Sequence, residues 1–220
     1  KEGLRLQQLG LYQGAVDAYK IAISFKRDFL DAYYNMGIAY GSLEEAGVDV
    51  LDNALGALKQ SVRLNSNFIH GHIALGAAYI RKEDYESALD ALERAILINS
   101  KDPNAHYYMG VVCRATKKFE KAAASLHNSV LLKPDSLQMQ YFLGLVLIDC
   151  EKFQRACDAL NEAVRIKPGF AEGHYMLGYV YLEKLFDVEK GAYHLSKAEK
   201  LYIKLEDFDR LEKVRAMLIK

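Results

Sequence analysis

The stretch His106-Tyr107-Tyr108-Met109-Gly110 decides the fold, because variants of it recur along the chain. The glycines that end these blocks at positions 76, 110, 144 and 178 are each 34 residues apart, and Gly3 and Gly37 keep the same distance. Only the step from Gly37 to Gly76 is longer, at 39 residues. A fixed period of this length indicates a stack of similar supersecondary units.

Each period contains two helical segments whose small and large residues fall in columns. Small residues stand twelve and nineteen positions after the glycine, and a large residue lies between them. Because small residues let two helices approach and large ones fill the remaining space, each period predicts an antiparallel helical hairpin. Aromatic residues near the turn are expected to pack the open end of the hairpin, namely Tyr12, Tyr85, Phe119 and Phe153.

This pattern resembles the tetratricopeptide repeat family over essentially the whole chain. The matching residues are Gly76, Tyr79, Tyr85, Ala88, Leu92 and Ala95 in one repeat, and Gly144, Phe153, Ala156, Leu160, Ala163 and Pro168 in another. The resemblance implies an all-α, right-handed superhelical solenoid of antiparallel helix pairs. The expected repeats are 1–29 (partial), 30–68 (with an insertion), 69–102, 103–136, 137–170 and 171–203, followed by a C-terminal capping helix at about 205–220.

Two segments depart from the regular period. Five extra residues lie within 42–53, where Glu44, Glu45, Asp49 and Asp52 occur without a basic residue. They predict either an extended, solvated turn or an acidic site that recruits a basic partner. The capping helix is expected to bury the apolar positions Leu205, Phe208, Leu211, Val214 and Leu218. A capping box at Asp209 and Glu212 would start it as a separate helix, and the alternative is one long helix from repeat six.

Composition excludes several classes of function. The charge is balanced, with 29 basic and 29 acidic residues and no basic block, which argues against a nucleic-acid partner. The longest apolar runs are far shorter than the roughly 20 residues that a membrane span needs. The three cysteines lack metal-like spacing and are expected to stay reduced, as in the cytoplasm.

The sequence carries no catalytic motif, so we expect neither an enzyme nor a cofactor. His72, His106 and His174 recur at one register of the repeat. Equivalent residues of stacked helices are about 8–10 Å apart, whereas zinc is bound at about 2 Å. We therefore expect these histidines to pack between helices, and no metal site.

A second apolar stripe runs along the first helix of each repeat, at three before, one after and four after the glycine. In the tetratricopeptide family this stripe lines the concave groove. An exposed apolar groove favours an apolar or amphipathic peptide segment as its ligand. The alternative is that the stripe serves tighter packing between repeats. The predicted groove residues are Tyr34, Ile38, Ile73, Tyr107, Val111, Arg114, Tyr141, Leu145, Ile148, Tyr175, Tyr179 and Leu182.

The favoured function is a non-catalytic scaffold or adaptor that binds a protein or peptide partner. Some family members hold a C-terminal carboxylate with Lys, Asn and Arg, but only Asn35 matches that clamp here, so chaperone tails are not expected. One alternative is a self-assembling homo-oligomer, peripheral to a membrane or organelle. Another is the interaction arm of a longer enzyme, because the first repeat is partial.

Overall fold

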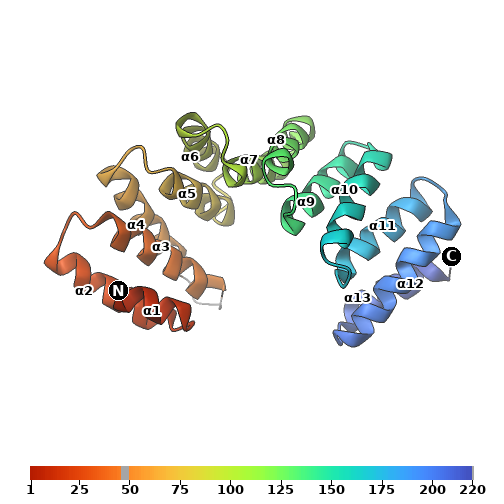
Figure 1. The fold of residues 1–220 in the computed structure, drawn as a ribbon, viewed down its shortest axis with the longest axis horizontal. Coiled ribbons are helices and arrows are strands. Elements are labelled where there is room, and N and C mark those ends of the chain that lie inside the picture. The colour runs from red at the N-terminus through yellow and green to blue at the C-terminus, as the bar shows by residue number, and fades with distance from the viewer. Residues whose placement is uncertain (46–49, 220) are drawn as a thin grey trace. The chain divides into compact units, whose positions relative to one another are not determined.

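The computed structural model describes residues 1–45 and 50–219, which form helices joined by short turns (Figure 1). The helices are α1 (Glu2–Gln8), α2 (Tyr12–Phe25), α3 (Leu30–Glu45), α4 (Leu51–Leu64), α5 (Ile69–Arg81), α6 (Tyr85–Ile98), α7 (Pro103–Ala115), α8 (Phe119–Leu132), α9 (Leu137–Asp149), α10 (Phe153–Ile166), α11 (Ala171–Glu183), α12 (Val188–Lys204) and α13 (Phe208–Leu218). The all-α prediction is confirmed for the part of the chain that is described.

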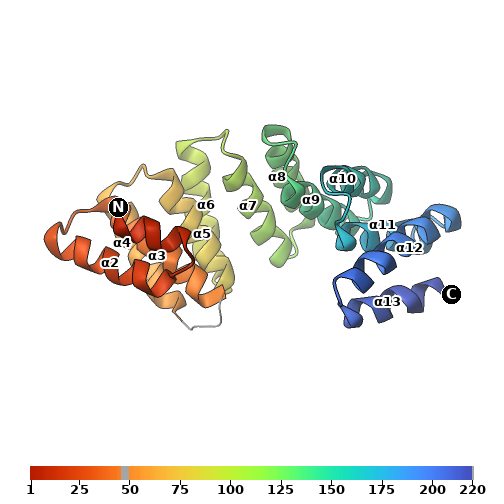
Figure 2. The ribbon, with the colours of Figure 1, turned by 60° about the horizontal axis from the view of Figure 1, so that its bottom comes forward.

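Consecutive helices pack in pairs, which Figures 1 and 2 show as successive hairpins. Within each unit the first helix of a repeat packs on the second, as α5 does on α6 and α9 on α10. The helices gather into two compact units, Lys1–Val112 and Cys113–Lys220. The predicted solenoid of helix pairs is thus confirmed as a stack of hairpins within each unit.

The repeated glycines mark the closest approach of the two helices in a hairpin. A Cβ atom added to Gly76 would lie 2.5 Å from Leu92 Cγ, closer than real Cβ contacts. The same relation joins Gly144 to Leu160, at 2.6 Å. Leu92 and Leu160 are fully buried, so the large-residue column fills the space that each glycine leaves.

The residue four before the glycine holds the turn between repeats by a hydrogen bond to the carbonyl six residues earlier. The Nε2 atom of His72 lies 2.9 Å from Ser66 O, and that of His106 lies 2.8 Å from Ser100 O. In repeat five the Gln140 amide makes the same contact with Pro134 O, at 3.0 Å. Since a carbonyl only accepts, each ring donates from Nε2. These histidines were expected only to pack, and the structure adds this polar role.

The C-terminal helix α13 is separate from α12, but its predicted capping box at Asp209 and Glu212 is wrong. The N-cap is Asp207, whose carboxylate accepts from the Arg210 amide at 3.1 Å. The chain bends just before it at Glu206, which has a φ of 55°. Asp209 therefore already lies in the first turn of the helix, where a negative charge suits the helix dipole.

The predicted apolar face of this helix also needs correction. Leu211 and Val214 are buried as expected, and Met217 joins them. Leu205, Phe208 and Leu218 are exposed instead. Leu205 lies before the helix, as the C-cap of α12, and Phe208 is the first residue of α13. Two ion pairs fix the helix to its unit, Arg210 with Glu172 on α11 and Arg215 with Glu199 on α12.

Two acidic residues of the insertion in repeat two pair with basic residues of repeat three. The carboxylate of Asp52 lies 2.5 Å from Lys82 Nζ, and Glu44 pairs with Arg81. Asp49 lies outside the described residues. Residues 42–45 belong to α3 and residues 51–53 to α4, so the described part of the insertion is helical. The carboxylates of Glu44 and Asp52 are both paired within the chain.

Candidate functional site

A pocket of about 460 Å³ opens in the unit Lys1–Val112. The first helices of repeats two, three and four line it together with α4. Its lining is mostly apolar and is formed by Tyr34, Gly37, Ile38, Gly41, Ser42, Leu51, Ala54, Leu58, His70, Ile73, Ala74, Ala77, Ala78, Ile80, Arg81, Asn104, Tyr107, Tyr108 and Val111. The volume is within the range of about 300–1,000 Å³ that is typical of ligand sites.

Five of the twelve predicted groove residues come together in this pocket, namely Tyr34, Ile38, Ile73, Tyr107 and Val111. The other seven belong to the unit Cys113–Lys220 and do not line it. Ile73 and Tyr107 are buried, and the remaining groove residues are half-buried. The second stripe is therefore partly covered by the protein itself.

Packing between consecutive repeats covers much of the stripe. The Tyr34 ring meets Phe68 edge-to-face at 5.1 Å, and Tyr141 meets Phe170 in the same way at 5.0 Å. Each phenylalanine directly precedes the first helix of the next repeat. Burial raises the pKa of the Tyr34 hydroxyl, and the nearby Tyr108 raises it further, so Tyr34 is neutral at physiological pH.

In the unit Cys113–Lys220, the predicted groove residues also serve the core. Tyr141, Ile148 and Tyr179 pack around the cluster that contains Leu160. Tyr175 and Leu182 pack around the cluster that contains Leu195. Arg114 Nε donates to Asp149 at 2.6 Å and so ties α7 to α9. Packing between repeats, the alternative to ligand binding, thus explains why part of the second stripe is apolar.

The pocket lies where repeat two has smaller residues than most other repeats at two equivalent positions. The position four after the glycine is Ile80, Ile148 or Leu182 in repeats three, five and six, Gln7 or Arg114 in repeats one and four, and Gly41 here. The position three before the first small residue of the second helix is Tyr12, Tyr85, Phe119 or Phe153 in repeats one, three, four and five, Val188 in repeat six and Leu51 here. Gly41 and Leu51 both line the pocket. Sequence reasoning missed the pocket, although these two smaller residues were its visible signal.

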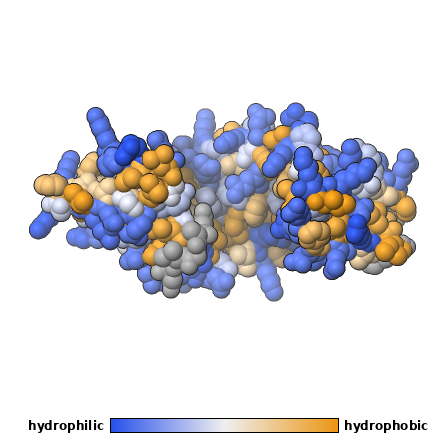
Figure 3. All heavy atoms as spheres, turned by 90° about the horizontal axis from the view of Figure 1, so that it is seen from below, coloured by the Kyte–Doolittle hydropathy of each residue, from blue (hydrophilic) through white to orange (hydrophobic). Residues whose placement is uncertain are grey.

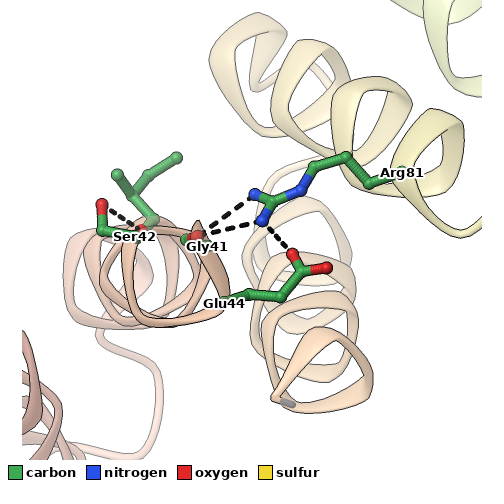
Figure 4. Close-up of polar contacts among 5 residues, drawn as sticks. Gly41, Ser42, Glu44 and Arg81 are labelled. Atoms are coloured by element: carbon green, nitrogen blue, oxygen red, sulfur yellow. Dashed lines mark hydrogen bonds and ion pairs between the residues drawn. The ribbon is translucent and has the colours of Figure 1, made fainter. Parts of the chain in front are cut away.

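Arg81 forms one end of the pocket and joins two repeats there. Its guanidinium extends from α5 toward the last turn of α3 and donates to Gly41 O, at 3.1 Å from Nη1 and 3.2 Å from Nη2 (Figure 4). The same group pairs with Glu44. A positive charge at the C-terminal end of a helix is favourable, so Arg81 both caps α3 and fixes its distance from α5.

The described lining is mostly apolar and so suits recognition of an apolar group. Its polar side chains are tyrosines, Ser42, His70, Arg81 and Asn104. Among residues 1–45 and 50–219, no group of three His, Cys, Asp or Glu residues is placed to hold a metal. None of the described helices combines the length and hydropathy of a membrane span. Hydrophilic and hydrophobic residues are interspersed on the face shown in Figure 3.

Comparison with known proteins identifies the repeats. A family model described as TPR repeat matches residues 3–43. A model described as anaphase-promoting complex, cyclosome, subunit 3 matches residues 81–163. A search of curated proteins gave no match.

Several solved structures share the fold. YrrB, described as a TPR protein with an unusual peptide-binding site, is 23% identical, with 84% of this chain and 93% of YrrB covered and a TM-score of 0.66. MamA from Desulfovibrio magneticus RS-1 is 23% identical, with coverages of 80% and 96% and a TM-score of 0.69. A chain of the APC/C hetero-tetramer Cut9-Hcn1 is 18% identical, with coverages of 96% and 41% and a TM-score of 0.78.

The family models, the hairpin packing and these neighbours agree on one repeat type. Repeats of this type are generally non-catalytic interaction modules that bind protein partners. The chain thus carries tetratricopeptide-type repeats in the two matched segments and has the fold of tetratricopeptide-repeat proteins.

Proposed function

We propose that this protein is a non-catalytic scaffold that binds an apolar or amphipathic segment of a protein partner, and that the pocket in the unit Lys1–Val112 is its main contact site. The observation that carries the proposal is the pocket itself, a concave apolar surface between three first helices. The peptide-binding site named for YrrB supports a peptide as the ligand class.

The pocket offers the features that a peptide site needs. Ile38, Ala77 and Val111 present apolar surface at the same register of three successive repeats. Removing such surface from water favours binding by roughly 25 cal/mol per Å² before the costs of ordering the peptide. Tyrosine hydroxyls at the walls supply hydrogen bonds that orient a peptide backbone. Cys113, Cys150 and Cys157 are not joined in disulfides, which suits a reducing compartment such as the cytoplasm.

A selection from a random peptide library on the 220-residue protein tests this function. Selected peptides should bind the wild type and lose at least about tenfold in affinity with Ala77→Glu, because a buried charge without a partner would then face the apolar ligand. The matched control is Gln60→Glu, which adds the same charge at an exposed position of α4. Equal affinity of both variants would place the binding site elsewhere.

Light scattering separates this function from self-assembly. We expect a monomer at all concentrations, with the pocket filled by a different chain. Concentration-dependent growth that Ala77→Glu suppresses would favour a homo-oligomer in place of the scaffold.

A further inference from the structure

We propose that the pocket receives an aromatic side chain of the partner, in the place that a resident aromatic ring takes in other repeats. The inference rests on the proposed function of the pocket and adds the chemistry of the residue that anchors the partner. It follows from what the equivalent positions do in repeats three and five.

In those repeats an aliphatic and an aromatic residue close the hairpin together. Ile80 and Tyr85 pack against the same cluster as Ala88 and Leu92. Ile148 and Phe153 pack against the same cluster as Leu160. Each pair joins the end of the first helix to the start of the second.

Repeat two replaces both members of the pair by smaller residues. Gly41 stands where Ile80 and Ile148 stand, and Leu51 stands where Tyr85 and Phe153 stand. Gly41 and Leu51 line the same pocket. Among the described residues, the pocket is thus lined by the two positions that hold the aliphatic and the aromatic side chain in repeats three and five.

The size and the walls of the pocket agree with this occupant. An apolar cavity of about 150 Å³ already admits a benzene ring in other proteins, and this pocket has about 460 Å³. Tyr34, Tyr107 and Tyr108 line it and can meet a further ring edge-to-face. Arg81 forms the end at Gly41, and its charge is already directed to Gly41 O and Glu44. The site thus favours an uncharged ring over an anionic group.

Small probes test the anchor without knowledge of the partner. N-acetyl-phenylalanine amide and N-acetyl-leucine amide are titrated into the protein, and the methyl resonances of Ile38 and Ile73 are followed by NMR. We expect saturable shifts and an affinity for the phenylalanine probe that is about threefold to tenfold higher, from the additional ring contacts. Equal or tighter binding of the leucine probe would overturn the inference.

The variant Leu51→Phe provides the second test, because it introduces the aromatic residue that repeats one, three, four and five have at this position. This variant should abolish the shifts caused by the phenylalanine probe while the thermal midpoint is kept or raised. Gly41→Ala is a milder version, since its Cβ would lie 3.4 Å from Arg81 Nη1. The control Gly56→Ala makes the same change on α4, where an added Cβ has nothing within 4 Å, and should leave probe binding unchanged. Undiminished probe binding in Leu51→Phe and Gly41→Ala would overturn the inference.

The selected peptides distinguish failure of the anchor from failure of the function. Peptides that require the pocket but carry only aliphatic residues at their sensitive position would leave the scaffold function intact and contradict the aromatic anchor. Peptides that bind equally well to Ala77→Glu would contradict the function itself.

Discussion

His174 Nδ1 lies 3.0 Å from His194 Nδ1, so two buried imidazoles share one proton between α11 and α12. His174 also uses Nε2 to donate to Pro168 O at 3.2 Å, which leaves its Nδ1 as the acceptor. His194 is therefore the donor of the pair, and its ring stacks on Tyr181. Desolvation lowers the pKa of both rings, and the nearby His174 contributes to a pKa of about 4 for His194.

This pair predicts a loss of stability in mild acid. Because the pKa of His194 falls from about 6.5 in the unfolded chain to about 4 in the fold, its contribution is complete above pH 6.5 and is lost as pH falls toward 4. One pKa unit corresponds to about 1.4 kcal/mol, so the loss is on the order of 3 kcal/mol. Urea unfolding between pH 7.5 and 4.5 measures it, and the double variant His174→Gln/His194→Gln should show a flatter profile. The exposed His127→Gln is the control, and an unchanged profile in the double variant would contradict the assignment.

Ser129 and Ser61 occupy the same column but differ in their hydrogen bonds. Ser61 Oγ donates to Leu58 O at 2.7 Å, whereas Ser129 Oγ is buried and, among the described residues, has no partner. Since an unsatisfied buried hydroxyl costs about 1–3 kcal/mol, Ser129→Ala should stabilise the protein by roughly 1 kcal/mol. Ser61→Ala should be neutral or destabilising. Chemical denaturation of both variants checks this, and a destabilised Ser129→Ala would mean that the hydroxyl is satisfied.

Gly76→Ala should destabilise the hairpin of α5 and α6. Alanine favours a helix over glycine by about 1 kcal/mol, but its Cβ would lie 2.5 Å from Leu92 Cγ. Leu92 is fully buried and cannot move aside without disturbing the core, so we expect a net loss of about 1–3 kcal/mol. Thermal unfolding measures the loss. The exposed Gly56→Ala is the control and should gain stability, and a similar gain in Gly76→Ala would contradict the close approach.

The helical hairpins can be predicted from the sequence because small and large residues recur at fixed positions within each period. The glycine of each block and the leucine sixteen residues later, as at Gly76 and Leu92, predict a close contact that the structure shows. Exposure of the second stripe is different in kind, because it depends on how one hairpin packs on the next. Tyr34 and Tyr141 were expected to face a ligand, yet each also packs against a phenylalanine of the following repeat.

The pocket and the start of α13 show two further limits of sequence patterns. The pocket arises where two columns are interrupted in one repeat, at Gly41 and Leu51, and each interruption alone resembles ordinary variation. Asp207 and Asp209 are equally good capping residues by type. Only the bend at Glu206 decides that Asp207 meets the free amide of Arg210.

Arg81→Ala should destabilise the C-terminal end of α3, which forms part of the pocket wall. The guanidinium supplies two hydrogen bonds to Gly41 O and the ion pair with Glu44, and hydrogen bonds from charged groups contribute about 1.5–3 kcal/mol. We expect amide hydrogen exchange at Ser42 and Leu43 to accelerate by about tenfold or more while distant helices keep their protection. Lys82→Ala is the matched control, because the adjacent Lys82 pairs with the exposed Asp52 outside the pocket. If both variants behave alike, Arg81 does not position α3. If only Arg81→Ala opens the helix end and lowers the affinity for selected peptides, the spacing of α3 and α5 controls access to the pocket.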